Sequence, residues 1–531
     1  MAQTIRLTAT DGSTVEFVDE VIGSGAMKDV YFSPDKSYVV GFFRTPQDAN
    51  AKDRLNNITG VYRDRIFNQV GGEYWKNLFC WPTKMVEWNG KLGIVCPTYA
   101  KHFFFDSGRF KGKEKEGKWF ASAKLRNKFI EDEHKGTWLT HFHMCIQIAR
   151  AVKRLHAAGL AHSDLSYKNV LVDPKTGRAN IIDCDGLVVP GKYPPDVVGT
   201  PDFIAPEVLE TRSLKVGDPN KKLPSIQTDR HALSVLIYMY LLYRHPLRGG
   251  KVNDLDAAKD EELSMGSKAL FIEHPTDKSN RPKVDQLAPS ELPQGDVTKL
   301  PYTICGPYLK DLFDKAFIDG LHNPTMRPTA DDWVTALVKT TDLMQPCQNP
   351  YCKAHWFVFD NSTKPKCPFC GTEYHGQLPI LNFYSSYGHG NFRPDNYRLM
   401  VYNKQTMYLW HVNKFIFPNE KLTDDQKRPV GDFHFHNGKW ILINRRLPEL
   451  WDKDTDTKIE IGQFVELTEG KKILLGKNDG DRLIIVQLVN NLRAKERVNL
   501  WLKINAIIVR SAAHQTVGRL LYLIVCLVSI I

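Results

Sequence analysis

Hydrophobic and polar residues recur with strand-like spacing through much of the first hundred residues. Residues 15–45 predict short strands joined by a glycine-containing turn. Two apolar stretches within residues 84–99 flank Asn89-Gly90, a dipeptide that favours a tight hairpin turn. Between these regions, apolar residues recur at helical spacing at Leu55, Ile58, Tyr62 and Ile66. Residues 1–100 are therefore expected to be strand-rich.

A helix-rich region is expected over residues 138–340. One helical face carries Phe142, Ile146, Ala149, Val152 and Leu155, and Gly159 is a natural helix stop. Residues 228–243 are nearly all apolar, which predicts a buried helix. Residues 101–128 are polar and rich in lysine, and we expect a solvated loop there. A strand-rich lobe beside a helix-rich lobe favours a ligand site in the cleft between them.

The character of the chain changes at Cys347. Strand-like pieces follow until about residue 490, and residues 491–531 are basic and end in the apolar run LLYLIVCLVSII. We therefore expect an α+β chain in four parts, with boundaries at residues 15–340, 341–376, 377–490 and 491–531.

Composition and charge narrow the class of protein. Of 531 residues, 42% are hydrophobic, which is ordinary for a globular chain and excludes a disordered or collagen-like one. The net charge of +11 is dilute, so it suits an anionic ligand without indicating nucleic acid. The N-terminal residues lack the apolar stretch of a signal peptide, and the C-terminal apolar run is shorter than the ~20 residues that span a bilayer. We expect a cytoplasmic protein without a nucleic-acid or membrane partner.

The most informative motif is HSDLSYKN, at residues 162–169. Asp183 follows in IIDCDG, and GTPDFIAPE ends at Glu207. This order resembles the protein kinase superfamily, in which the catalytic loop reads H-R-D-x-x-x-x-N, the metal loop D-F-G, and the segment closes with A-P-E. The resemblance implies a bilobal protein-kinase-like fold.

Phosphoryl transfer needs a carboxylate to orient the attacking hydroxyl and oxygen ligands to hold Mg²⁺ on the phosphates of ATP. By position in the motifs, Asp164 matches the catalytic base, Asn169 the second-metal ligand and Asp183 the principal metal ligand. His162 matches a structural histidine of the loop, and Thr200 would shape the substrate-side loop.

Two further matches concern the frame of the helical lobe. Asp229, in TDRHALSVLIYMY, matches the aspartate that ties down the catalytic-loop backbone. Arg327, in NPTMRPTADDW, matches the late arginine that pairs with the A-P-E glutamate, here Glu207. If such a pair is buried, removal of one partner strands a charge.

The sequence departs from the family pattern at three positions. Ser163 replaces the arginine of H-R-D, which puts activation by phosphorylation in doubt. Asp185 replaces the glycine of D-F-G, and Ser166 stands where serine/threonine kinases carry lysine. HSDLSYKN is closer to the H-x-D-L-S-x-x-N of atypical kinases of the RIO type.

The lysine that should meet the ATP phosphates is displaced. Residues 22–31 resemble the glycine-rich loop, with Gly23 and Gly25 at its first two glycines and Val30 at its valine. The strand that should carry V-A-I-K reads YVVGFF and has no lysine. Either the chain is a catalytically inactive pseudokinase that acts as a nucleotide-binding scaffold, or Lys28 reaches the phosphates from the loop, as in the with-no-lysine kinases. We favour the second interpretation.

Other nucleotide contacts follow from the same resemblance. Pro97-Thr98-Tyr99 fits the hinge segment, so Thr98 and Tyr99 would meet adenine. The helix glutamate that normally partners the lysine has two candidates of unconvincing spacing, Asp64 and Glu73.

Four cysteines crowd into residues 347–370. Cys347-x4-Cys352 and Cys367-x2-Cys370 have the spacing of two metal-binding turns, which predicts a structural zinc ribbon with four sulfur ligands. So small a ribbon should fold only with metal.

The whole arrangement resembles one bacterial family, the serine/threonine kinases of tellurite-resistance-associated phosphorylation triads. The stretches GAMKDVYFSPDKSYVV and FCWPT support this. The resemblance implies stress signalling, a protein substrate, and association with a von Willebrand factor A-type protein and a metal-dependent protein phosphatase. Residues 440–476 faintly resemble the forkhead-associated sandwich, without the arginine, serine and asparagine that grip phosphothreonine there. A β-rich interaction domain is expected.

Overall fold

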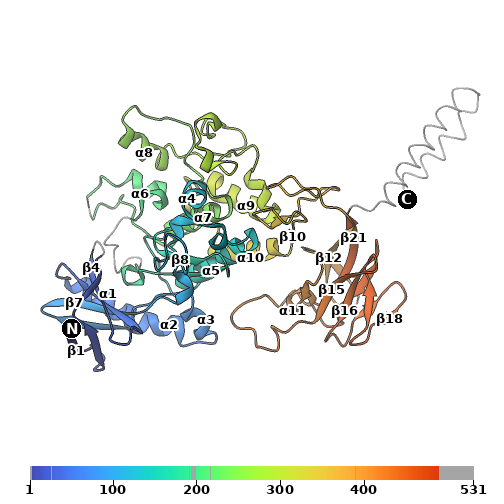
Figure 1. The fold of residues 1–531 in the computed structure, drawn as a ribbon, viewed down its shortest axis with the longest axis horizontal. Coiled ribbons are helices and arrows are strands. Elements are labelled where there is room, and N and C mark those ends of the chain that lie inside the picture. Colours follow the sequence, from blue (N-terminus) through green and yellow to red (C-terminus); the bar gives the residue numbers. More distant parts are fainter. Residues whose placement is uncertain are drawn as a thin grey trace, which may run out of the picture. The chain divides into compact units, whose positions relative to one another are not determined.

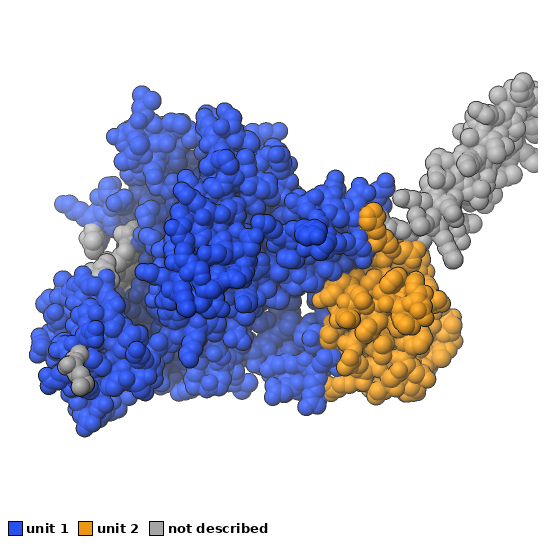
Figure 2. All heavy atoms as spheres, viewed as in Figure 1, with its two compact units in different colours: residues 1–374, 396–400, 408–429 blue, residues 375–395, 401–407, 430–531 orange. Residues whose placement is uncertain are grey.

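The computed structural model describes residues 3–24, 27–189, 192, 199–215, 217–388 and 390–489. Two compact units emerge, coloured separately in Figure 2. Unit 1 comprises residues 1–374, 396–400 and 408–429, and unit 2 the remainder. Gly25 and the basic, apolar tail at residues 491–531 lie outside the described residues. Within the described residues, no helix has the length and apolar character needed to cross a membrane.

Unit 1 begins with antiparallel strands, as its alternating pattern predicts. A hairpin of β1 (Thr4–Thr8) and β2 (Thr14–Val18) precedes a five-stranded sheet of order β3-β4-β5-β7-β6 (Figure 1). The strands of this sheet are β3 (Val21–Ser24), β4 (Lys28–Phe32), β5 (Tyr38–Phe43), β6 (Lys84–Trp88) and β7 (Lys91–Pro97). Asn89 and Gly90 both have positive φ, which allows the tight β6–β7 turn.

The segment between β5 and β6, in which apolar residues recur at helical spacing, forms an interrupted helix. Helix α1 (Ala49–Asn57) is capped by the Asp48 carboxylate and continues into a short π-helix at Ile58–Tyr62. Two short helices follow, α2 (Arg63–Phe67) and α3 (Gly72–Lys76). The predicted apolar positions remain on the buried side, with Leu55, Ile58 and Ile66 almost fully covered.

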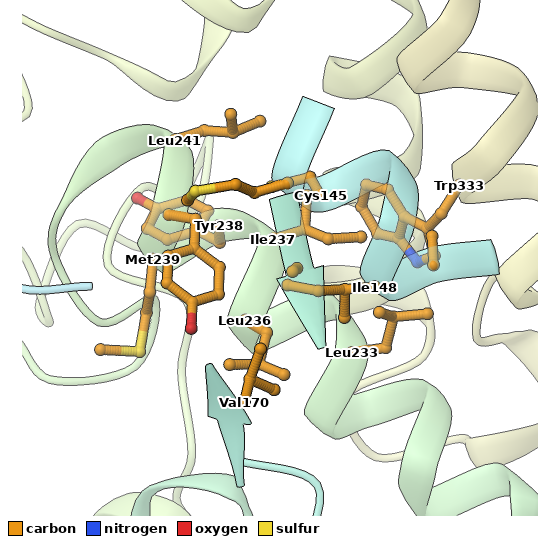
Figure 3. Packing of buried hydrophobic residues seen from close by; sticks show 14 of the residues in the cluster. Cys145, Ile148, Val170, Leu233, Leu236, Ile237, Tyr238, Met239, Leu241 and Trp333 are labelled. Carbon is orange, nitrogen blue, oxygen red and sulfur yellow. The ribbon is translucent and has the colours of Figure 1, made fainter. Parts of the chain in front are cut away.

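The larger part of unit 1 is built around two long helices. Helix α5 (Trp138–Ala157) starts at a Thr137 capping box, and α7 (Ile226–Leu242) is buried along nearly its whole length. Figure 3 shows Cys145 and Ile148 of α5 beside Leu233 and Ile237 of α7. The other elements of this part are α4 (Ala123–Phe129), α6 (Pro206–Glu210), α8 (Ala257–Met265), α9 (Pro307–Asp314), α10 (Ala330–Thr341), β8 (Val170–Asp173) and β9 (Arg178–Ile181).

The solvated loop expected at residues 101–128 is wrong. Phe103, Phe105 and Phe120 are buried, and the region ends in helix α4. Lys115 is buried too, with its Nζ 2.8 Å from Asp173 Oδ1. The lysine-rich composition predicted a solvated loop because the aromatic residues of this stretch are irregularly spaced and show no helical or strand period.

The four-cysteine segment packs on α5. It contains the strand pair β10 (Met344–Pro346) and β11 (Trp356–Val358). Trp138 N donates to Ala354 O at 3.0 Å, and the rings of Trp138 and Phe369 lie 4.8 Å apart. The segment therefore shares the core of unit 1 and does not stand alone. The small helix α11 (Leu409–Val412) also belongs to unit 1.

Two sheets follow the cysteine segment, of order β13-β12-β21-β20-β17-β18 and β14-β15-β16-β19. Their residues belong to unit 2, except that residues 396–400 of β13 are grouped with unit 1. Their strands are β12 (Leu378–Ser386), β13 (Phe392–Met400), β14 (Thr406–Met407), β15 (Gly431–His436), β16 (Lys439–Asn444), β17 (Trp451–Asp452), β18 (Thr457–Lys458), β19 (Phe464–Glu466), β20 (Lys472–Leu474) and β21 (Arg482–Val489). Strands thus recur from residue 378 to residue 489, whereas residues 408–429 are grouped with unit 1.

An ion pair joins α6 to the segment before α10. Arg327 Nη1 and Nη2 lie 2.8 and 2.7 Å from the two Glu207 carboxylate oxygens. The side chain of Arg327 is 0% exposed and that of Glu207 is 20% exposed. Arg327 also donates to the carbonyls of Gly320, Gln227 and Leu321.

We predict that Glu207→Gln lowers the free energy of unfolding by about 3–5 kcal/mol, because it leaves a buried guanidinium without its counter-charge. Urea denaturation measures the change. The matched control is Asp331→Asn, which removes the exposed Lys153–Asp331 pair of the same lobe and should cost at most about 1 kcal/mol. Equal losses in the two variants would contradict this assignment.

Candidate functional site

A cleft of about 530 Å³ opens between the sheet of unit 1 and the loops that follow α5. Its sheet side is formed by β4, β5 and β7, and its other side by the loops at residues 162–164 and 183–186. The charged residues that line it are Lys28, Arg54, Asp164, Asp183 and Asp185. Such a charged cleft suits a polar, anionic ligand.

Three hydrogen bonds hold the Asp164 carboxylate, and a fourth reaches the backbone carbonyl of the same residue. Its Oδ1 accepts from Thr200 N at 2.6 Å and from Thr200 Oγ1 at 2.8 Å. Asn169 Nδ2 donates to Asp164 Oδ2 at 2.9 Å and to Asp164 O at 2.8 Å. Asp164, Asn169 and Thr200 are thus brought together, and the carboxylate has one orientation at the edge of the cleft. Thr200 Oγ1 also lies 3.2 Å from Ser166 Oγ.

Helix α7 anchors the loop that carries Asp164. Asp229 is buried and accepts hydrogen bonds from the backbone N–H groups of His162, at 2.7 Å, and Ser163, at 3.2 Å. His162 Nε2 lies 3.0 Å from Ile182 O, which links this loop to the one that carries Asp183. Ser163 and Asp183 both have positive φ, a strained conformation that clusters at functional sites.

Lys28 lies between two carboxylates of the cleft. Its Nζ is 2.6 Å from Asp185 Oδ2 and 3.5 Å from Asp183 Oδ1. Burial lowers the pKa of Lys28, but the carboxylates of Asp185 and Asp183 raise it by more, so the net pKa is well above the ordinary value. Asp183 is half exposed, and its partial burial together with the neighbouring Asp185 raises the pKa of its carboxyl group. Burial also raises the pKa of Asp185, but Lys28 outweighs it and the net shift is downward.

The strand register explains why a lysine on β4 can reach this place. Lys28 pairs with Phe43, the last residue of YVVGFF, so the two side chains share one region of the sheet. Lys28 Nζ lies 5.3 Å from the centre of the Phe43 ring, and its Cδ passes beside Gly41. The cation therefore enters the cleft from the neighbouring strand.

The helix after β5 presents a cation to the cleft. Arg54 of α1 is buried and lines the cleft, whereas the two sequence candidates for a helix glutamate, Asp64 and Glu73, are exposed. Glu73 pairs with Lys76 of its own helix. Neither Asp64 nor Glu73 lines the cleft.

The remaining sequence candidates divide between the cleft and its surroundings. Val30 and Tyr99 line the cleft, beside the apolar residues Val39 and Ile94. Thr98 turns away, since its Oγ1 donates to Lys36 O at 2.8 Å, and it lines a neighbouring cavity of about 410 Å³. Gly23 lies on exposed strand β3 and is not a lining residue.

Sequence reasoning missed the roles of Asp185 and Arg54. The sequence marks Asp185 only as a substituted glycine, and its pairing with Lys28 follows from tertiary structure. The signal that could have revealed it is the joint absence of a strand lysine and of a well-spaced helix glutamate. The cysteines Cys80 and Cys96, which also line the cleft, carried no sequence signal.

The four clustered cysteines converge. All four sulfurs lie within 4.8 Å of one another, with Cys347 and Cys370 at 3.5 Å and Cys352 and Cys367 at 3.8 Å. A tetrahedral zinc ion with bonds of about 2.3 Å keeps its sulfurs roughly 3.8 Å apart. The donor set and its spacing therefore fit zinc.

Comparison with known proteins gives a family match over part of the chain. Residues 119–336 match the protein kinase domain family. The chain is 36% identical over 101 residues to serine/threonine-protein kinase PSK1 of Saccharomyces cerevisiae, an alignment that covers 19% of this chain and 7% of that protein. It is 29% identical over 151 residues to serine/threonine-protein kinase PknD of Chlamydia felis, covering 24% and 14%. The alignments thus span a small part of these relatives. A solved rhoptry kinase from Toxoplasma gondii is 14% identical and covers 64% of this chain and 84% of that chain, with a TM-score of 0.39.

Proposed function

We propose that this chain, which contains a protein kinase domain over residues 119–336, is an ATP-dependent serine/threonine protein kinase. The observation that carries the proposal is the cradle of Asp164, whose carboxylate is fixed by Asn169 and Thr200 at the edge of a cleft that also holds Asp183 and Lys28. These are the groups that phosphoryl transfer requires, in one place.

Asp164 would act on the acceptor hydroxyl. Thr200 and Asn169 hold its carboxylate still, so that it can accept the hydroxyl proton and orient the oxygen for in-line attack on the γ-phosphate. A bond forms between the hydroxyl oxygen and the γ-phosphorus. The bond between the γ-phosphorus and the β–γ bridging oxygen breaks, and ADP leaves. Ser163 stands where an arginine would meet an activating phosphate, so we propose activity without phosphorylation of the activation segment.

Asn169 and Asp183 would hold Mg²⁺, whose charge offsets that of the phosphates. The donor set fits this hard cation, because both residues offer oxygen and Asp183 is half exposed toward the cleft. Lys28 would supply the protein's own cation to the phosphates, and Gly23 and Gly25 would let the loop approach them. Val30 and Tyr99 would contact the adenine.

The four-cysteine segment would hold a structural zinc ion through Cys347, Cys352, Cys367 and Cys370. Four thiolates leave no open position, so the ion would stabilise the segment and its contact with Trp138 of α5.

The cellular setting follows from the resemblance to tellurite-resistance phosphorylation triads. We propose a cytoplasmic bacterial kinase in stress signalling that acts on a protein substrate. Its partners would be a von Willebrand factor A-type protein and a metal-dependent phosphatase, with the β-rich unit 2, of faintly forkhead-associated character, as an interaction domain.

Asp164→Ala should lower phosphate transfer at least about 100-fold, because the variant loses the group that orients the hydroxyl. The assay measures label from γ-labelled ATP with Mg²⁺ in the full chain and in a serine- and threonine-containing peptide library. If wild type and variant incorporate label equally, the enzyme proposal fails and the nucleotide-binding scaffold remains.

Lys28→Met should abolish transfer, because the described residues that line the cleft include no other lysine to meet the phosphates. Lys36→Met is the matched control: Lys36 is an exposed lysine on the turn between β4 and β5. The same labelling assay compares the two variants. Loss with Lys36→Met and retention with Lys28→Met would show that the lysine has been misplaced.

Purified full-length protein should contain about one equivalent of zinc, and Cys367→Ser/Cys370→Ser should lose it. Elemental analysis measures the metal, and Cys80→Ser, which leaves the cluster intact, should retain it. An unchanged zinc content in the double variant would rule out this site.

A further inference from the structure

The buried cation of the cleft has its carboxylate partner on the metal loop. In protein kinases the phosphate-binding lysine pairs with a glutamate of the helix that follows its strand, and movement of that helix makes or breaks the pair. Here Lys28 Nζ lies 2.6 Å from Asp185 Oδ2, and the two side chains are only 19% and 11% exposed. The partner therefore comes from the D-C-D sequence at residues 183–185.

The helix that follows β5 offers no substitute. The described carboxylates that line the cleft are Asp164, Asp183 and Asp185, all from the loops on the opposite side. Helix α1 contributes Arg54 instead. Its one acidic residue, Asp53, is exposed and lies 3.8 Å from Lys192 Nζ.

We propose that Asp185 is the positioning residue of Lys28 and takes over the role of the helix glutamate. This inference rests on the proposed function. Asp185 and the metal ligand Asp183 lie two residues apart on one loop, and Asp183 holds the left-handed φ of 60° that sets the loop's shape. One loop conformation thus positions both the metal ligand and the cation, and the position of α1 does not control the pair.

The charge arrangement gives Asp185 a second effect, on magnesium. Lys28 Nζ is also 3.5 Å from Asp183 Oδ1, so two carboxylates share one ammonium group. Because Asp185 makes the shorter contact, Asp183 remains available to a metal. Without the Asp185 charge, the buried ammonium group turns to Asp183 as its remaining partner and competes with the metal for it.

The test is a magnesium titration of nucleotide binding in the full chain. Binding of a fluorescent ATP analogue is measured as Mg²⁺ is raised, for wild type, Asp185→Asn, Asp185→Gly and Asp185→Glu. Asp185→Asn should raise the half-saturating Mg²⁺ concentration about tenfold or more. Asp185→Gly restores the family's D-F-G glycine and should be as defective as Asp185→Asn. Asp185→Glu keeps the charge and should recover much of the wild-type response.

Matched controls come from the helices. Asp64→Asn and Glu73→Gln remove exposed carboxylates of α2 and α3 and should leave the titration unchanged. The proposal is overturned if Asp185→Asn or Asp185→Gly responds to Mg²⁺ as wild type does, or if a helix variant shows the shift. Melting temperatures identify any variant that fails to fold, and Asp185→Glu then carries the test.

This readout separates the two proposals. A wild-type chain that binds Mg-ATP without transferring phosphate defeats the kinase proposal, while the magnesium shift still tests Asp185. A chain that transfers phosphate but shows no shift in Asp185→Asn retains the kinase function and loses this inference.

Discussion

A cation buried in the cleft of unit 1 requires carboxylate partners, and this requirement organises the candidate site. Lys28 enters from β4, and the loop at residues 183–186 supplies Asp185 and Asp183 to meet it. A buried ammonium group without such partners would shed its proton or move into solvent. The sheet and the loop are therefore joined at the point where phosphates would be received.

The helical part supplies the rigid base for this meeting. Asp229, at the start of buried helix α7, grips the backbone of the Asp164 loop, and His162 connects that loop to residue 182. The Glu207–Arg327 pair ties the end of the Thr200 segment to the residues before α10. Thr200 in turn holds Asp164, so the orientation of one carboxylate depends on contacts from three separate stretches of chain.

The sequence predicted the features that depend on interactions between residues close together along the chain. Asn89-Gly90 indicated the β6–β7 hairpin because that dipeptide favours a tight turn. Apolar spacing predicted α5, and a nearly continuous apolar run predicted α7. The displaced Lys28 was expected at the cleft because the strand YVVGFF lacks a lysine. The pairing of Lys28 with Asp185 joins residues 157 positions apart and has no local signature. The burial of Phe103 and Phe105 among lysines, and the packing of Trp138 on the cysteine segment, likewise depend on surfaces that only the folded chain brings together.

In the proposed kinase, Lys28, Asn169 and Asp183 receive a magnesium-bound triphosphate beside Asp164. A crystal structure with Mg²⁺ and a non-hydrolysable ATP analogue would show whether they do. We expect the Lys28 ammonium group within hydrogen-bonding distance of a phosphate oxygen, with Asn169 and Asp183 both on the metal. A nucleotide bound with these three side chains pointing away from its phosphates, or with another cation in the place of Lys28, would contradict it.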